Sequence, residues 1–227
     1  MKVTPEGDRL IRLTRLNFVN AYLVREDDGF TLVDTMISGS AKGIVEAAQA
    51  QGAAIKRIVL THGHADHVGS VDALAEQIPG VEVFISARDS RFLKGDKSLD
   101  PEEQMGKPRG SWVNVKTPTR PVAPGERIGS LEAVASPGHT PGHLSFIDTR
   151  DRTLIAGDAY TTIGGVATAA KGSLVFPLAA MASWHKPTAV ESARALRALD
   201  PARLAVGHGQ VVDSPGQAMD AAIAKVS

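Results

Sequence analysis

The segment THGHADHVGS, residues 61–70, holds three of the chain's seven histidines and an aspartate within six positions. In an extended segment alternate side chains share a face, so His62 and His64 can point the same way, while Asp66 and His67 begin the turn into a helix. Imidazole nitrogens and carboxylate oxygens are ligands of divalent transition metals. The segment therefore predicts that four side chains converge on a metal site.

Three other histidines lie in similar places, at the ends of the motifs SPGH (His139), GH (His143) and VGH (His208). Two of them come directly after a predicted strand, where loops carry functional residues. Histidines that are merely solvated on a loop would not explain this recurrence. Because the chain contains no cysteine, disulfides and a thiol nucleophile are excluded, and any metal must bind nitrogen and oxygen.

Strands and helices that could position these residues occur in both halves of the chain. Strand patterns lead into the motifs of His62, His139 and His208, and helices are predicted over 40–51 and 67–78 and after a capping box formed by Thr188 and Glu191. Residues 91–125 lack periodicity and predict a long loop or lid. The order of elements predicts one domain, residues 1–227, with two sheets face to face and helices on the outside.

The composition narrows the class of function. Twenty-five basic side chains balance twenty-five acidic ones in 227 residues, so no global field favours nucleic acid as a partner. The N-terminus lacks the apolar run of a secretory signal, and no uninterrupted apolar segment is long enough to span a membrane. We therefore expect a cytoplasmic protein without a membrane helix.

The sequence resembles the metallo-β-lactamase superfamily of hydrolases from about residue 20 to residue 209. The resemblance lies in four motifs in the family's order: THGHADH, SPGHTPGH, AGDA and VGHG. It implies an α/β (α+β) fold, a four-layer αββα sandwich, with the metal site at one edge of the two sheets.

The resemblance also implies a role for each ligand position. His62, His64 and His139 resemble the ligands of a first metal, and Asp66, His67 and His208 resemble those of a second. Asp158 resembles the carboxylate that bridges the two metals, and Asp34 resembles an early aspartate that supports the ligand loops.

This ligand set suits two divalent ions, Zn²⁺ first, with Fe, Mn or Co as alternatives that share its ligands. Two ions about 3.5 to 4 Å apart can hold a shared water and lower its pKa toward 7. The resulting hydroxide would attack a lactone, ester or thioester carbonyl, and Asp66 would orient it and shuttle its proton.

Other residues are weaker candidates. Tyr160 could donate a hydrogen bond to the oxyanion, as a tyrosine does in lactonases of this superfamily at a different spacing, or it could simply pack. His143 is expected to be structural or to support a ligand, because the seven ligand places are filled. Trp184 and His185 could form a pocket wall, but ordinary surface packing is the more common role.

The apolar residues between 161 and 182 could line a pocket for an apolar part of the substrate, or they could form the interface of a homodimer. Asp158 stands where some β-lactamases have cysteine, which favours esterase-like and thioesterase-like members. A glyoxalase II is expected to have a dedicated C-terminal helical domain that holds glutathione, and only a helix, a strand and a short helix are predicted after Trp184. Cleavage of β-lactams or phosphoesters is a further alternative, as a promiscuous activity.

Two readings from other classes compete with the hydrolase. Some members of the superfamily are oxidoreductases that use one iron for sulfur dioxygenation or a di-iron site for oxygen and nitric oxide reduction. A complete set of seven ligands favours two metals over the mononuclear form. A metal-bound scaffold or RNA-processing relative finds no support in the neutral charge or in the complete ligand set.

Overall fold

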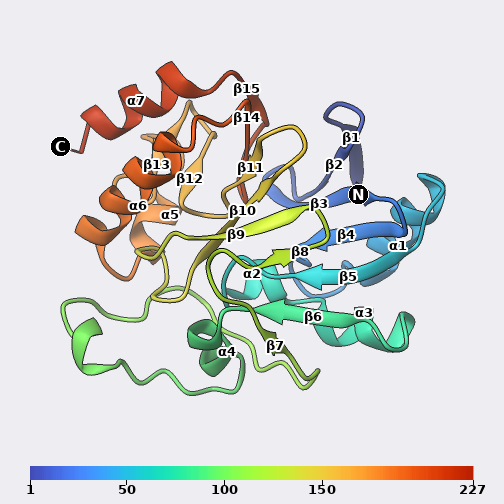
Figure 1. Cartoon of the computed structure of the whole chain (residues 1–227). Helices are drawn as coiled ribbons and strands as arrows, with labels where there is room; N and C mark the ends of the chain where they lie inside the picture. The colour runs from blue at the N-terminus through green and yellow to red at the C-terminus, as the bar shows by residue number, and fades with distance from the viewer. Residues whose placement is uncertain (227) are drawn as a thin grey trace. The chain divides into compact units, whose positions relative to one another are not determined.

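The computed structural model describes residues 1–226, which divide into two units (Figure 1). The first unit comprises residues 1–95 and 111–122, and the second comprises residues 96–110 and the chain from 123 onward. The segment expected to be a loop or lid therefore contributes to both units. Its regular structure is limited to the end of one helix, a single 3₁₀ turn and a two-residue strand. The single domain and the lid remain predictions.

A seven-stranded sheet with the order β1-β2-β3-β4-β5-β6-β7 forms the first unit. Pairing is antiparallel from β1 to β4 and parallel from β4 to β7. The elements are β1 (Lys2–Pro5), β2 (Leu10–Arg15), β3 (Val19–Glu26), β4 (Gly29–Val33), α1 (Ala41–Ala50), β5 (Ile55–Val59), α2 (Ala65–Val68), α3 (Val71–Gln77), β6 (Glu82–Ile85), α4 (Ala87–Leu93) and β7 (Arg120–Pro121).

Helices α1 and α3 pack against this sheet through apolar side chains at helical spacing. Ile44 and Ala48 of α1 and Leu74 of α3 are buried in one cluster with Leu32 and Ile58 of the central strands. Gly52 follows α1 with a positive φ of 83°, as expected for a helix C-terminus. The predicted helix over 40–51 is confirmed, because its apolar stripe faces the sheet.

The predicted single helix over 67–78 is wrong, since the structure has α2 and α3 with a break at Gly69. The Gly69 N–H donates to the carbonyl of Met36 at 2.9 Å instead of continuing the helix. A Cβ at this position would lie 2.5 Å from the backbone nitrogen of Ser38, so only glycine allows the two chain segments to approach this closely. The hydrogen bond at this break connects the histidine-rich segment to the loop that follows β4.

The second unit contains a six-stranded sheet with the order β15-β14-β11-β10-β9-β8 and a separate hairpin of β12 and β13. Within the sheet, β11 and β14 are parallel and the other neighbours are antiparallel. The elements are η1 (Pro101–Glu103), β8 (Arg127–Ile128), β9 (Leu131–Ala135), β10 (Leu144–Asp148), β11 (Thr153–Ile155), β12 (Tyr160–Thr161), β13 (Ala167–Thr168), α5 (Leu178–Ala182), α6 (Lys186–Ala198), β14 (Arg203–Ala205), β15 (Val212–Asp213) and α7 (Gly216–Ala224).

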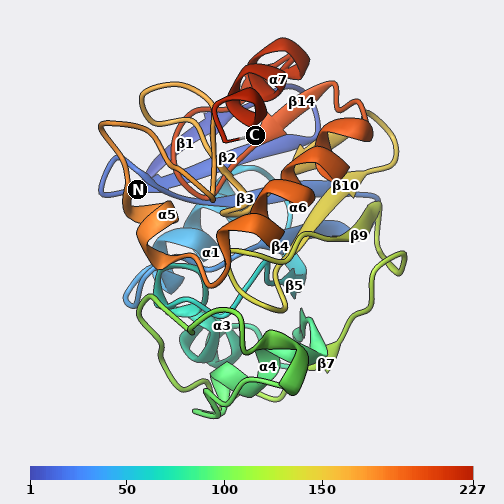
Figure 2. The ribbon, with the colours of Figure 1, turned by 90° about the vertical axis from the view of Figure 1, so that its left-hand side faces the viewer.

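Helices α6 and α7 lie side by side in this unit (Figure 2). Leu196 of α6 and Met219 of α7 are buried with Leu154 and Leu204 of the sheet. The predicted capping box at Thr188 and Glu191 is wrong, because α6 begins earlier. His185 is the N-cap, and its side chain accepts the backbone N–H of Thr188. Glu191 instead pairs with Arg194 at 2.7 Å.

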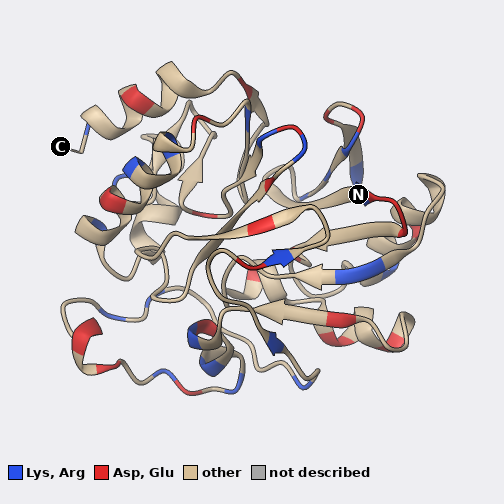
Figure 3. Ribbon diagram, viewed as in Figure 1, with Lys and Arg blue, Asp and Glu red and all other residues tan. Residues whose placement is uncertain are grey.

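Acidic and basic residues are interspersed along the ribbon of each unit (Figure 3). This distribution agrees with equal counts of 25 acidic and 25 basic side chains. Among residues 1–226, no helix has the length and apolar character needed to cross a membrane.

Candidate metal centre

Three parallel strands of the first unit deliver polar residues to one edge of the sheet. Asp34 follows β4, the segment from His62 to His67 follows β5, and Asp89 lies in α4, directly after β6. Because β4, β5 and β6 run parallel, their carboxyl ends meet at the same edge. His62, His64 and His67 are each at most 3 % exposed. The structure thus brings the first-unit candidates together at one sheet edge.

Asp34 fixes the orientation of two of these histidines. One carboxylate oxygen lies 2.7 Å from Nδ1 of His67 and accepts the hydroxyl of Thr61 at 2.8 Å. The same hydroxyl oxygen lies 3.0 Å from Nδ1 of His62. Since a carboxylate only accepts, and the threonine hydroxyl is already used as a donor, Nδ1 carries the proton on both rings. The Nε2 atoms of His62 and His67 are therefore the nitrogens with a lone pair for a metal.

The Nε2 atom of His62 faces Nδ1 of His64 at 3.0 Å. Two ligand nitrogens at about 2.0–2.1 Å from one tetrahedral zinc would lie little more than 3 Å apart, so this spacing suits two ligands of one ion. The His64 ring also lies against Trp112, with ring centroids 4.5 Å apart. Between the two histidines, the Gly63 N–H donates to the buried carboxylate of Asp89 at 3.0 Å.

Asp66 is the most exposed of the first-unit candidates. Its side chain is 33 % exposed and one carboxylate oxygen lies 4.0 Å from Nε2 of His67. It lies in the first turn of the short helix α2, which is acidic only at this position. Asp66 therefore combines proximity to a candidate ligand histidine with access to solvent.

In the second unit, His139, Asp158 and His208 follow strands β9, β11 and β14. β11 and β14 are parallel, and β9 has the same direction because both β9 and β11 run antiparallel to β10. All three loops therefore leave the sheet at the same edge. One oxygen of Asp158 lies 3.4 Å from Nε2 of His139 and 3.2 Å from Nε2 of His208. This placement of a carboxylate between two imidazoles suits a shared ligand.

Residues of the segment between β13 and α6 contact the two candidate ligand histidines of the second unit, His139 and His208. The hydroxyl of Ser183 lies 3.1 Å from Nδ1 of His139 and within hydrogen-bond distance of the carbonyls of Ala169 and Ala179. Since the serine donates to a carbonyl, it accepts from Nδ1–H and leaves Nε2 of His139 for a metal. The ring of Phe176 lies against the ring of His208, with centroids 5.1 Å apart.

His143 supports Asp158. Its Nε2 accepts the backbone N–H of Asp158 at 3.1 Å, and its Nδ1 lies 2.8 Å from the hydroxyl of Ser136. With both ring nitrogens engaged, the side chain holds the backbone of a candidate ligand. This arrangement agrees with the supporting role expected from the sequence.

Tyr160 is fully buried in the cluster beneath α6. Its hydroxyl donates to the carbonyl of Ala193 at 2.8 Å. Burial, with a smaller contribution from Asp220, raises the pKa of the phenol well above its usual range. The hydroxyl is thus already committed within the core, which favours the packing alternative over oxyanion donation.

Trp184 and His185 also have structural partners within the second unit. The indole N–H of Trp184 donates to the carbonyl of Glu103 at 3.1 Å, and a Cβ on Gly106 would lie 2.4 Å from that nitrogen. His185 caps α6 through Thr188, which lies 2.8 Å from Nδ1. Trp184 therefore anchors the segment around Glu103, and His185 begins a helix.

All seven predicted ligands are candidate metal-binding residues by side-chain chemistry and placement. Sequence reasoning missed the residues that orient them: Thr61, Asp89, Trp112, Phe176 and Ser183. The sequence carries a local signal near Asp89, because serine is a typical N-cap residue. In the structure Ser86 is the N-cap of α4 and accepts the backbone N–H of Asp89. Thr61 lies within the motif THGHADH, but its role in orienting a histidine was not predicted. Trp112, Phe176 and Ser183 lie far in the sequence from the residues that they contact.

Comparison with known proteins assigns the family and the fold. Residues 14–208 match the family described as the metallo-beta-lactamase superfamily. The protein YobT of Bacillus subtilis is 46% identical over 209 residues, which cover 91% of this chain and 90% of YobT. A hydroxyacylglutathione hydrolase of Xanthomonas oryzae is 30% identical over 162 residues, which cover 69% of this chain and 52% of that protein.

Among solved structures, that of TTHA1623 in a di-iron-bound form has a TM-score of 0.68 and 27% sequence identity, and the match covers 91% of this chain and 95% of that chain. The metallo-β-lactamase SMB-1 has a TM-score of 0.73 at 18% identity, which bears on the fold alone. The predicted family and fold class are confirmed.

Proposed function

Because the chain belongs to the metallo-beta-lactamase superfamily, we propose that it is a dinuclear metal-dependent hydrolase acting on the carbonyl of a lactone, ester or thioester. The observation that carries the proposal is the orientation of its histidines. His62, His67 and His139 each engage Nδ1 with an oxygen of a neighbouring side chain and leave Nε2 free of a proton. Such partners fix a metal-binding tautomer before any metal arrives.

We assign His62, His64 and His139 to one cation and Asp66, His67 and His208 to the other, with Asp158 shared by both. The donor atoms are nitrogen and oxygen only, which suits Zn²⁺ and also Fe, Mn or Co. Two such cations supply a water of lowered pKa and polarise the substrate carbonyl.

Within the chain, Asp66 is the residue suited to move the proton. Its carboxylate is partly exposed, so it can accept a proton from a bound water and pass it to the leaving group or to solvent. Asp34 is buried and tied to His67 and Thr61, so it holds the ligands without exchanging protons with the substrate.

We further propose that an apolar part of the substrate binds the segment before α6. Leu174, Val175, Leu178 and Met181 are all at least 53 % exposed within eight residues, which is unusual clustering for large apolar side chains. Phe176 of the same segment contacts the ring of His208, a candidate ligand. The same residues suit the interface of a homodimer, which a measurement of mass in solution with and without substrate analogue would separate from a substrate surface.

Hydrolysis of a glutathione thioester is the second candidate. It is favoured by the similarity to hydroxyacylglutathione hydrolases, although the aligned region spans about half the length of the Xanthomonas oryzae protein. An oxidoreductase remains the alternative that a single bound iron would favour. A cytoplasmic location is part of the same proposal.

The test is a hydrolysis panel of lactones, esters, thioesters, β-lactams and phosphate esters, run on protein of measured metal content. We expect turnover of one carbonyl class, loss of that turnover after treatment with a chelator, and recovery on adding metal. Preferred turnover of S-lactoylglutathione would select the second candidate. A fully loaded protein that hydrolyses no member of the panel would contradict the proposal.

A further inference from the structure

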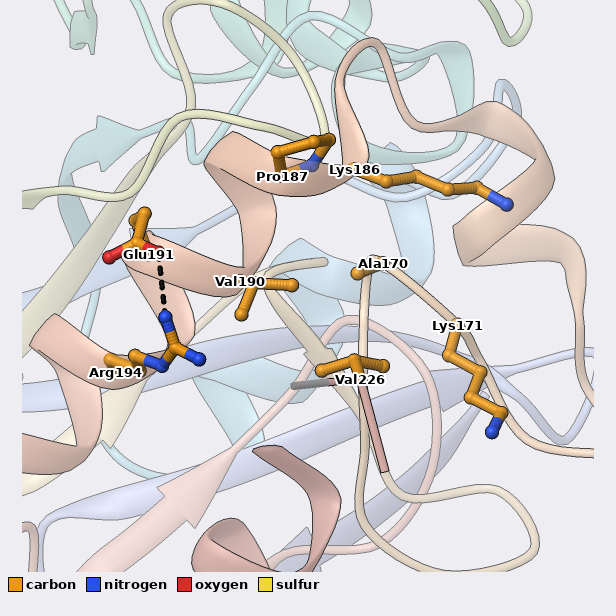
Figure 4. Close-up of a pocket in the computed structure, with 8 residues that line it drawn as sticks. All are labelled: Ala170, Lys171, Lys186, Pro187, Val190, Glu191, Arg194 and Val226. Carbon is orange, nitrogen blue, oxygen red and sulfur yellow. Dashed lines mark hydrogen bonds and ion pairs between the residues drawn. The ribbon is translucent and has the colours of Figure 1, made fainter. Parts of the chain in front are cut away.

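A cavity of about 540 Å³ lies in the second unit beside the first turns of α6, apart from the residues described above as candidate ligands. This volume falls within the range of about 300–1,000 Å³ that is typical of small-molecule sites. The lining residues come from α6, from the segment after β13 and from the segment that follows α7 (Figure 4). They are Ala170, Lys171, Lys186, Pro187, Val190, Glu191, Arg194 and Val226.

The floor of this cavity is aliphatic. Ala170 and Val190 belong to a small buried cluster with Ala169 and Ala189, and Val226 packs against that cluster. Pro187 extends the same surface but is itself exposed. The aliphatic cluster therefore lines an open cavity, and no side chain of the described residues closes it.

The rim of the cavity is cationic. Of its four charged residues, Glu191 is the only acid, and it is already paired with Arg194 at 2.7 Å. In Figure 4 this pair lies on one side of Val190, and the ammonium groups of Lys171 and Lys186 lie on the other. Lys171 donates to the carbonyl of Lys225 at 3.2 Å, and no carboxylate among residues 1–226 pairs with it. Within residues 1–226, Lys186 forms no ion pair. The rim therefore offers positive charge to an incoming anion.

We propose that this cavity binds an amphipathic monocarboxylate, with the carboxylate at Lys171 and Lys186 and the aliphatic chain on Ala170, Val190 and Val226. The charge of the rim selects an anion, and the aliphatic floor selects a ligand with an alkyl chain rather than a small polar ion.

An amphipathic monocarboxylate is also the kind of product that the proposed hydrolysis would release. Only this connection between the cavity and the reaction rests on the proposed function. Hydrolysis of an apolar ester or thioester adds water across the acyl bond, releases the alcohol or thiol, and leaves a carboxylic acid with an apolar portion. Hydrolysis of a lactone adds water across the same bond and opens the ring to a single hydroxy acid. The cavity would then hold the acid product, or one like it, away from the ligand residues and would make the protein sensitive to its accumulation.

Octanoate is the probe that tests binding. Its affinity for the full chain is measured by calorimetry and compared with that of acetate, which lacks the chain, and of 1-octanol, which lacks the charge. We expect octanoate to bind about tenfold more tightly than either, because only octanoate satisfies both the rim and the floor. The methyl signals of Val190 and Val226 should shift during the same titration.

The double variant K171Q/K186Q tests the rim, and K42Q removes one charge from an exposed lysine of α1 that does not line the cavity. We expect K171Q/K186Q to weaken octanoate binding about tenfold while K42Q leaves it unchanged. Equal affinity for octanoate and 1-octanol, unchanged binding by K171Q/K186Q, or an unshifted Val190 methyl would each overturn the proposal.

The experiments distinguish a failure of the proposed carboxylate site from a failure of the proposed hydrolase activity. If octanoate binds at Val190 but the hydrolysis panel is negative, the binding site stands and only its link to a product is lost. If a substrate is hydrolysed and octanoate does not bind, the hydrolase stands and the second site is wrong.

Discussion

The two units hold their candidate ligands in different ways. In the first unit the four candidates lie within residues 62–67, and two of them, His62 and His67, share one support, Asp34, which contacts His67 directly and His62 through Thr61. In the second unit His139, Asp158 and His208 come from three separate loops, and each has its own support: Ser183, His143 and Phe176.

This difference decides how many candidate ligands lose their support when one supporting residue is replaced. A shared support means that one substitution disturbs two ligands at once, whereas separate supports confine the damage to one. The first unit should therefore be the more sensitive to a single change outside its ligands, and the second the more tolerant. Four substitutions test this contrast.

Replacing Asp66 by alanine should have the largest effect, because this residue is both a proposed ligand and the proposed proton carrier. We expect the turnover of the best substrate to fall by roughly a hundredfold to ten-thousandfold. The melting temperature should stay close to that of the wild type, since the side chain is partly exposed. D8A is the matched control at an exposed aspartate, and unchanged turnover in D66A would remove Asp66 from the mechanism.

D34A should be the most damaging change outside the ligands. It leaves the buried Thr61 and His67 without their acceptor, which costs about 2–4 kcal/mol of stability in a site of this kind. Metal affinity should fall by about 10- to 100-fold, because the support of two ligands is lost. Denaturant unfolding and competition with a coloured chelator measure the two effects. D34N, which keeps one acceptor oxygen, should lie between D34A and the wild type.

S183A should have a milder effect than D34A, since Ser183 supports His139 alone. We expect metal affinity to fall by about tenfold or less and stability by about 1 kcal/mol. S90A, which removes an exposed hydroxyl that bonds only to a nearby carbonyl of α4, is the control. If S183A weakened metal binding as much as D34A, the contrast between shared and separate supports would be lost.

Y160F should have the smallest effect on turnover, within about twofold, because the hydroxyl donates to Ala193 in the core. The lost hydrogen bond should cost about 1 kcal/mol of stability. Burial raises the pKa of Tyr160, so the folded protein keeps this proton at a pH where the unfolded chain loses it, near pH 10. Stability of the wild type should therefore fall as the pH rises above 10, and less steeply in Y160F. A loss of turnover of tenfold or more in Y160F would instead favour the oxyanion role.

The sequence singles out the candidate ligands but not most of the side chains that contact them. The pattern from His62 to His67 is local, so an extended strand end followed by a turn is enough to bring its side chains together. Asp158 and His208 could be placed only by resemblance, because their proximity depends on β11 and β14 being parallel neighbours. Ser183 and His139 are in contact although they are 44 positions apart in the sequence, and no spacing pattern predicts such a contact.

The errors at the helices have similar physical causes. The periodicity over 67–78 was a real helical signal, but Gly69 breaks it because the backbone near Ser38 comes too close for a side chain. The capping pattern at Thr188 and Glu191 lost to His185, whose ring accepts the same backbone N–H from a residue that is uncommon at N-caps. In both cases a tertiary or side-chain contact outweighed the local pattern.

Elemental analysis of the purified protein tests the central claim most directly. The proposed function requires that the seven candidate ligands bind two cations per chain, with Asp158 shared between them. It predicts close to two equivalents of metal in the wild type and a loss of metal in D34A that exceeds the loss in S183A. A reproducible content of one iron per chain, or none after incubation with zinc, iron and manganese, would contradict it.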